Sequence, residues 1–142
     1  MSNVPSGKTD YDAFGKAFAR TRKGMGWQEV DLFCERLKIR NPKPNVLDVG
    51  CGSGRLLEQL SVHFSDFRYV GTDSSRVLVN VASKDFPNRT FALADMREVT
   101  NHPKVRADAP FDAVFAVASF HHLLTVSDRV AALKEFSSVL AP

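Results

Sequence analysis

The sequence has few of the residues that build disulfide-linked, zinc-bound or membrane-spanning proteins. Its 142 residues include two cysteines, Cys34 and Cys51, and no C-x-x-C pair. Two cysteines cannot form a disulfide framework or a zinc ribbon. No stretch approaches the roughly 18 consecutive apolar residues of a membrane span, and the polar N-terminus has no apolar signal core behind it. The composition therefore predicts a soluble protein of the reducing cytoplasm.

The length allows one domain, since domains cluster near roughly 100 to 150 residues. A content of 44% hydrophobic and 10% aromatic residues is sufficient for a core. Charge is unevenly distributed: residues 1–44 hold nine Lys/Arg and five Asp/Glu, whereas residues 45–142 hold ten and eleven. The basic N-terminal third favours an anionic partner, although a few solvated lysines on a helix surface are the commoner explanation.

Apolar spacing predicts two N-terminal helices, over residues 10–23 and 27–37, that are separated by glycines. The prolines at positions 42 and 44 end the second helix, because proline removes a backbone donor and disfavours helix in the residue before it. We therefore expect a helical cap over residues 1–44, which is part of the same domain as a sheet-containing core over residues 45–142.

Strand and helix patterns alternate in the core. Strands are predicted over residues 46–49, 67–71, 90–94 and 111–118. Helices are predicted over residues 56–64, after an N-cap at Ser74, and from residue 125 onward, with a polar loop between the third and fourth strands. This alternation indicates an α/β fold with a parallel, doubly wound sheet.

Ligands of such sheets bind at the carboxyl ends of the strands, and three glycines lie just beyond the first strand. Gly50, Gly52 and Gly54 let backbone N–H groups approach a ligand, and the next helix directs its N-terminus at it. A mere tight turn is the alternative. Arg55 follows Gly54 directly, so the third glycine comes one residue too early for the G-x-G-x-x-G pattern of NAD or FAD sites.

Two carboxylates and one absence indicate the ligand. Asp73, at the end of the second strand, can accept hydrogen bonds from the two hydroxyls of a ribose. Asp48 lies two residues before Gly50, close enough to the loop to attract a cation. The loop lacks the lysine of a phosphate-binding P-loop. A ligand with a ribose and a positive charge but no pyrophosphate is S-adenosylmethionine.

Four motifs resemble the class I S-adenosylmethionine-dependent methyltransferases. Residues 46–54 resemble the first motif of that family residue for residue, and residues 69–73 resemble the second. Residues 94–96 are similar to the third-strand turn, and residues 111–116 with 120–123 are similar to the fourth-strand motif. The resemblance implies a Rossmann-like fold and S-adenosylmethionine as cofactor. It implies cofactor contacts from Asp48, Gly50, Cys51, Gly52, Gly54, Asp73, Ser74, Asp95, Met96 and Ala116.

In this family the acid at Asp95 receives the adenine amino group and the residue at Met96 packs on the ring. Segments within residues 11–27 and 118–135 further resemble the tRNA methyltransferases that esterify 5-carboxymethyluridine at the wobble position. That likeness implies a tRNA substrate, a contact of Arg22 with the methionine carboxylate of the cofactor, and a small zinc-binding activator protein.

A carboxylate acceptor is already ionised near neutral pH, so it needs no general base. His121 and His122 are then structural or substrate-positioning residues, although a histidine base for a hydroxyl or amine acceptor is an alternative. Adjacent histidines are expected to point in different directions, which argues against a metal pair.

The resembled fold has seven strands, whereas four can be assembled here. We therefore expect residues 111–118 to form an exposed sheet edge, and the chain to be a fragment or to be completed by self-association. Two other functions stay open: a non-catalytic S-adenosylmethionine-binding or interaction module, and a small-molecule methyltransferase.

Overall fold

The centre of the fold is a parallel four-stranded sheet in the order β3-β2-β1-β4. The computed structural model describes residues 11–21 and 26–142. The central pair aligns Asn45 with Arg68 and Val49 with Thr72. The strands are β1 (Asn45–Val49), β2 (Arg68–Asp73), β3 (Thr90–Leu93) and β4 (Ala113–Phe115). The predicted doubly wound parallel sheet is therefore confirmed.

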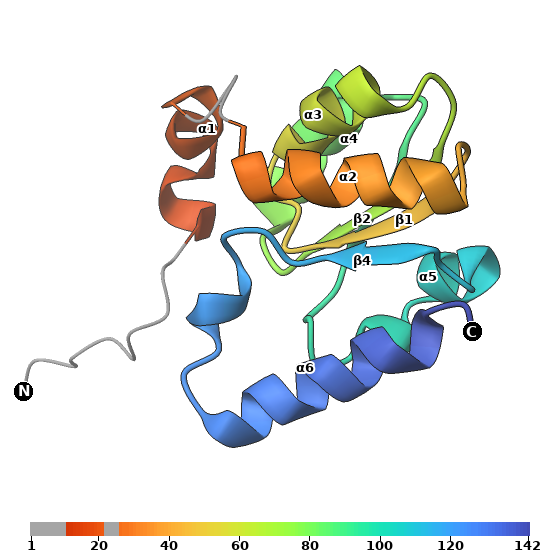
Figure 1. Cartoon of the computed structure of the whole chain (residues 1–142). Coiled ribbons are helices and arrows are strands. Elements are labelled where there is room, and N and C mark those ends of the chain that lie inside the picture. Colours follow the sequence, from red (N-terminus) through yellow and green to blue (C-terminus); the bar gives the residue numbers. More distant parts are fainter. Residues whose placement is uncertain (1–10, 22–25) are drawn as a thin grey trace, which may run out of the picture.

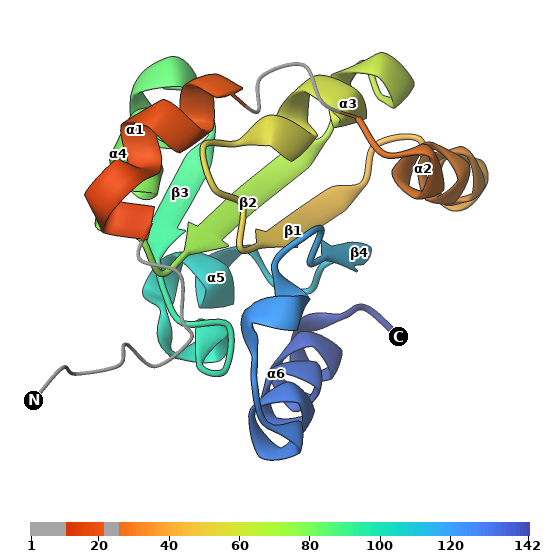
Figure 2. The same cartoon turned by 90° about the vertical axis from the view of Figure 1, so that its left-hand side faces the viewer.

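Helices cover both faces of this sheet, as Figures 1 and 2 show. One face carries α2 (Gln28–Arg40), α3 (Arg55–His63) and α4 (Arg76–Asp85). The opposite face carries α5 (Pro103–Asp108) and α6 (Val126–Val139). Short 3₁₀ turns, η1 (Val99–Asn101) and η2 (Phe120–His122), precede α5 and α6. In the part of the chain that the structure describes, no helix is long and apolar enough to cross a membrane. The cytoplasmic location stays a prediction.

Strand residues alternate between two cores, one on each face. Val46 and Tyr69 pack with the buried side chains of α2, α3 and α4. Leu47 and Val70, the next residue in each strand, pack with those of α5 and α6. The four are at most 4% exposed, as expected of strands covered on both faces. Because α2 contributes to the first core, part of the predicted N-terminal cap packs directly on the sheet; the boundary at residue 44 stays a prediction.

Helix α1 (Tyr11–Thr21) is held against the start of α4. The Asp12 carboxylate accepts hydrogen bonds from the Ser75 hydroxyl at 2.5 Å and from the Val77 backbone N–H at 3.2 Å. Gly15 is buried at this contact, and a Cβ there would lie 3.0 Å from a Val77 methyl carbon. An acidic side chain at a helix N-terminus and a small residue opposite it therefore seat α1 beside the carboxyl end of β2.

Two predicted segments differ from the structure. The fourth strand is shorter than residues 111–118, because β4 pairs with β1 only from Ala113 to Phe115. Phe111 instead forms an isolated parallel bridge with Leu140, so the chain end meets the start of the sheet edge. β4 lies at that edge, as expected.

The predicted polar loop between the third and fourth strands contains α5. Pro103 is the first residue of this helix, a position that tolerates proline because its backbone N–H would have no helical partner. The predicted N-cap at Ser74 is wrong by one residue: Ser75 caps α4 by accepting the Leu78 N–H at 3.3 Å.

Candidate functional site

The loop after β1 is shaped by glycines in the left-handed backbone region. Gly50 has φ +73° and Gly52 has φ +57°, a region that other residues adopt at a cost. The Gly50 and Cys51 N–H groups donate to the Thr72 carbonyl at 2.7 and 2.9 Å, which ties the loop to β2. A Cβ on Gly50 would lie only 2.3 Å from Ser119 Cβ, whereas a Cβ on Gly52 would meet nothing within 4 Å.

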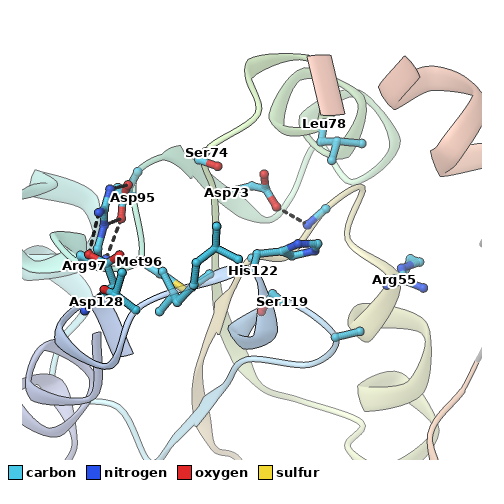
Figure 3. A pocket seen from close by; sticks show the side chains of 17 residues that line it. Arg55, Asp73, Ser74, Leu78, Asp95, Met96, Arg97, Ser119, His122 and Asp128 are labelled. Atoms are coloured by element: carbon cyan, nitrogen blue, oxygen red, sulfur yellow. Dashed lines mark hydrogen bonds and ion pairs between the residues drawn. The ribbon is translucent and has the colours of Figure 1, made fainter. Parts of the chain in front are cut away.

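A cavity of about 320 Å³ lies between this loop, the ends of β2 and β3, and the segment after β4. Six residues predicted to contact a cofactor line it, and so does one of the two histidines: Gly50, Gly52, Asp73, Ser74, Asp95, Met96 and His122. In Figure 3, Asp95, Arg97 and Asp128 lie at one end and Arg55 at the other, with Asp73 and His122 between them. The carboxyl ends of the strands therefore carry the site, as predicted.

Asp73 is held in place by backbone donors from two sides. Its Oδ2 accepts the Gly52 N–H at 2.9 Å and its Oδ1 accepts the Ser75 N–H at 2.8 Å. Burial raises the pKa of Asp73, while these two hydrogen bonds act in the opposite direction. A carboxylate has about four acceptor positions, so this fixed group has the chemistry to bind the two hydroxyls of a ribose.

Other predicted residues do not line the cavity. Asp48, Cys51, Gly54 and Ala116 are outside its wall, and Arg22 lies outside the described residues. Asp48 is 2% exposed and accepts a hydrogen bond from the Tyr69 hydroxyl at 2.8 Å, so it is not at the surface that a ligand cation would touch.

The buried Asp48 carboxyl lies beneath the glycine loop. Burial raises its pKa to about 7, although the Tyr69 hydrogen bond opposes this shift. Gly71 leaves space for the hydrogen-bonded side chains of Asp48 and Tyr69. A Cβ at Gly71 would lie 2.8 Å from the Tyr69 hydroxyl oxygen and 3.0 Å from Cys51 Sγ. Burial also raises the pKa of the Cys51 thiol, in agreement with its interpretation as a packing residue.

The end of the cavity at Asp95 contains an ion-pair cluster that sequence reasoning missed. Arg97 pairs with Asp95 through Nη2 at 2.7 Å and with Asp128 through Nη1 at 2.9 Å. The spacing of Asp95 and Arg97, two residues apart in a loop, was a local signal. The pairing of Arg97 with Asp128 joins residues 31 positions apart, so no local pattern in the sequence indicated it.

At the opposite end, Arg55 stacks on an aromatic ring. Its guanidinium carbon lies 4.8 Å from the centroid of the Trp27 ring, a cation–π contact between the start of α3 and the segment before α2. The sequence signal was a basic residue directly after the last glycine of the loop. The contact adds a cationic group to the cavity wall.

The segment after β4 forms the remaining wall and carries backbone strain. Ala118 has φ +51°, and the buried Ser119 hydroxyl donates to the Val49 carbonyl at 2.8 Å, which fixes the segment to β1. His122 lines the cavity and His121 is exposed. Burial, with His121 adding to it, lowers the pKa of His122, so its imidazole is neutral near pH 7.

The expected divergence of the two histidines is wrong, because their ring centroids lie 4.1 Å apart. Both residues belong to the 3₁₀ turn η2, in which no residue is buried, and their rings are tilted by 38° to each other. His122 is thus the histidine that faces the cavity, and His121 contacts it from outside.

A parallel sheet of this order, a glycine loop after β1 and a carboxylate at the end of β2 that lines the cavity are typical of a class I S-adenosylmethionine-dependent methyltransferase. Residues 46–142 match the family described as "Methyltransferase domain". The chain belongs to this family.

Curated relatives include methyltransferases of tRNA and of small molecules. The tRNA (carboxymethyluridine(34)-5-O)-methyltransferase alkbh8 of Xenopus tropicalis is 35% identical over 92% of this chain and 18% of its own length. The enzyme of that activity from Arabidopsis thaliana is 31% identical over 93% of this chain and 29% of its own length. Pavine N-methyltransferase of Thalictrum flavum is 29% identical over 66% of this chain and 26% of its own length. The chain thus spans less than a third of these three relatives.

Solved structures agree on the fold and the cofactor. The S-adenosylmethionine-bound amino pentose methyltransferase CalS10 of Micromonospora echinaspora superposes with a TM-score of 0.69 and 26% identity, over all of this chain and 55% of that one. The sugar N-methyltransferase KedS8 of Streptoalloteichus shares the fold, with a TM-score of 0.70 over 99% of this chain and 56% of its own, at 24% identity. The cofactor is S-adenosylmethionine, and its individual contacts stay predictions.

Proposed function

We propose that this chain carries the methyltransferase activity of the tRNA wobble-uridine branch, which forms the methyl ester of 5-carboxymethyluridine. The observation that supports this proposal is the extent of the similarity. The alignments with the two carboxymethyluridine methyltransferases cover 131 and 132 residues, more than the 97 residues of the family match, so they extend into the N-terminal helices. The similarity to pavine N-methyltransferase covers 98 residues.

The cavity fits the cofactor in one orientation. The adenine lies at the end that Asp95 and Met96 line, and the ribose hydroxyls bind Asp73. The methionine part then lies over the glycine loop, on the side of Arg55. The described residues support this placement because the Asp95 carboxylate, the Asp73 carboxylate and the Arg55 guanidinium follow one another along the cavity.

The protein's contribution to the reaction is position. S-adenosylmethionine supplies the methyl carbon as a sulfonium substituent. A carboxylate acceptor is ionised at neutral pH, so the chain must hold it in line with the carbon–sulfur bond rather than remove a proton. A neutral His122 has one N–H donor with which to orient an acceptor oxygen, and the basic residues of the N-terminal third favour the approach of RNA.

The test measures methyl transfer from radiolabelled S-adenosylmethionine to a tRNA that carries 5-carboxymethyluridine at the wobble position. The matched control is the same tRNA with an unmodified wobble uridine. We expect label only in the carboxymethyl tRNA, and its release as methanol after mild alkali, because an ester is hydrolysed there and a methylated base or ribose is not.

Label in the control tRNA, label that survives alkali, or no label at any protein concentration would overturn this proposal for the chain. The last result, combined with intact binding of S-adenosylhomocysteine, would favour the non-catalytic module. Label in small molecules alone would favour the small-molecule methyltransferase. The zinc-binding activator and self-association through β4 stay predictions.

The role of His122 is tested in the same assay by His122→Asn, with His121→Asn as the matched control. A positioning role predicts a lower rate at every pH without a change in the shape of the pH profile. Loss of a rate increase centred near the histidine pKa would instead assign His122 as a general base.

A further inference from the structure

Arg97 connects two parts of the cavity wall through its side chain, the turn after β3 and the start of α6. Its Nε and backbone N–H both donate to Asp95 Oδ1, each at 2.9 Å, and its Nη2 donates to Asp95 Oδ2 at 2.7 Å. Its Nη1 donates to Asp128 Oδ1 at 2.9 Å. Figure 3 shows the guanidinium between the two carboxylates at one end of the cavity. Arg97 therefore makes a forked contact with Asp95 and a single contact with α6.

The forked contact fixes the orientation of Asp95. Two parallel N–H···O bonds hold a carboxylate in one plane. An ionised carboxylate accepts hydrogen bonds and cannot donate one. At the Asp95 oxygens such a group attracts an amino group and repels a carbonyl oxygen.

The contact with Asp128 gives the cluster a second fixed point. Asp128 lies in the first turn of α6, where its N–H is capped by the Thr125 hydroxyl at 3.0 Å. Arg97 thus links the turn after β3 to the helix that follows the His122 segment. Because the linked groups are separated by 31 residues, removal of Arg97 frees Asp95 from a tertiary contact as well as from its ion pair.

We propose that Arg97 is a specificity-determining positioning residue, which holds Asp95 as an acceptor-only wall so that the cavity takes a 6-aminopurine nucleoside and rejects its 6-oxo counterpart. The inference rests on the proposed placement of the cofactor. It does not depend on the identity of the methyl acceptor.

The test is calorimetric titration of the full chain with S-adenosylhomocysteine and with its 6-oxo analogue, S-inosylhomocysteine. We expect the wild type to prefer the amino compound by about 100-fold, since the 6-oxo compound loses a charge-assisted hydrogen bond and places its carbonyl oxygen against a carboxylate oxygen. Arg97→Gln keeps the length of the side chain without its charge or fork, and should reduce this preference to below about 10-fold. Arg97→Lys keeps the charge alone and should give an intermediate preference.

The matched control is Arg106→Gln. Arg106 is an exposed arginine of α5 that donates only to backbone carbonyls, those of Thr100 and Asn101, among the contacts of the described residues. Its loss should leave both affinities and their ratio as in the wild type. Thermal unfolding of each variant establishes that it is folded. If Arg97→Gln is not folded, the preference of Arg97→Lys for one of the two compounds tests the proposal instead.

Three results would overturn the proposal: a wild type that binds both compounds equally, an Arg97 variant that keeps the full preference, or one that loses affinity for both compounds by the same factor. The last result would show a purely structural role. No binding of S-adenosylhomocysteine to the wild type would instead refute the placement of the cofactor, and with it the basis of this inference.

Discussion

The two ends of the cavity are built in different ways. At the glycine end, the shape comes from backbone: left-handed glycines, N–H groups that donate to the Thr72 carbonyl, and a Gly50 that touches Ser119. At the other end, where we propose that the nucleoside binds, charged side chains form the wall, with Arg97 between Asp95 and Asp128. The first end has no space for a Cβ at Gly50, and the second depends on charges.

This difference predicts different failures. An added methyl group should damage the glycine end through steric overlap, with loss of the fold. Removal of a charge should damage the nucleoside end through loss of recognition, with the fold preserved. Substitutions that add volume and substitutions that remove charge therefore distinguish the two kinds of construction.

The largest effect is expected for Gly50→Ala. The new Cβ would lie 2.3 Å from Ser119 Cβ on a backbone of φ +73°, so loop and segment must both shift, and we expect a loss of about 3 kcal/mol or more in the free energy of unfolding. Gly52→Ala is the matched control, because its Cβ meets nothing within 4 Å and only the backbone cost of about 1 kcal/mol remains. Urea denaturation measures both, and equal losses would contradict the steric explanation.

Asp73→Asn should have the next largest effect, on binding rather than on the fold. An amide cannot accept from Gly52, Ser75 and both ribose hydroxyls at once, so the affinity for S-adenosylhomocysteine should fall by about 100-fold. Asp85→Asn, at the exposed end of α4, is the control and should bind as the wild type does. Titration calorimetry measures the affinities, and undiminished binding would remove Asp73 from the site.

The comparison also explains which features could be predicted from sequence. The glycine loop and Asp73 lie within short motifs whose geometry is local, so the sequence predicted their elements and placed Gly50, Gly52 and Asp73 at the cavity. The Arg97–Asp128 and Trp27–Arg55 contacts join residues about 30 positions apart. Such pairs depend on how separate elements pack, which no local pattern contains.

Two further differences have local physical causes. Asp48 was predicted to face a ligand cation, but strand alternation directs it to the same face as Tyr69, beneath the loop. Helix α5 was predicted as a loop because prolines normally interrupt helices, whereas Pro103 occupies the first helical position. For both Asp48 and Pro103, the residue type alone led to the expectation, whereas the position of the residue within its strand or helix decided its role.

The third prediction concerns the buried acid beneath the glycine end. Burial raises the pKa of Asp48 from 3.8 to about 7, so between these values the folded chain binds more protons than the unfolded chain. The free energy of unfolding should therefore fall as pH rises through this window, by about 1.4 kcal/mol per pH unit for this one group. Asp48→Asn keeps an acceptor for Tyr69 but cannot ionise, and should remove this slope between pH 5 and 7.

Asp66→Asn is the matched control for this measurement, because the Asp66 side chain is 64% exposed and pairs only with the exposed Lys43 among the described residues. Its slope should equal that of the wild type in urea denaturation at pH 5, 6, 7 and 8. An unchanged slope in Asp48→Asn would mean that this carboxyl is ionised throughout, and that the glycine loop lies on a permanent negative charge.

The smallest effect is expected in the wall that neither end supplies, the segment after β4. Ala118 has φ +51°, where a Cβ crowds the following carbonyl oxygen, so Ala118→Gly should relieve about 1 kcal/mol or slightly more of strain. Part of this gain is offset because glycine is freer in the unfolded chain, which leaves a net stabilisation of about 0.5 kcal/mol in urea denaturation. The Ser119 hydroxyl, which donates to the Val49 carbonyl, keeps the segment on β1 in the variant, so the affinity for S-adenosylhomocysteine should not change. A more stable variant that binds this ligand more weakly would instead mean that the strained backbone at Ala118 holds the cavity in its binding shape.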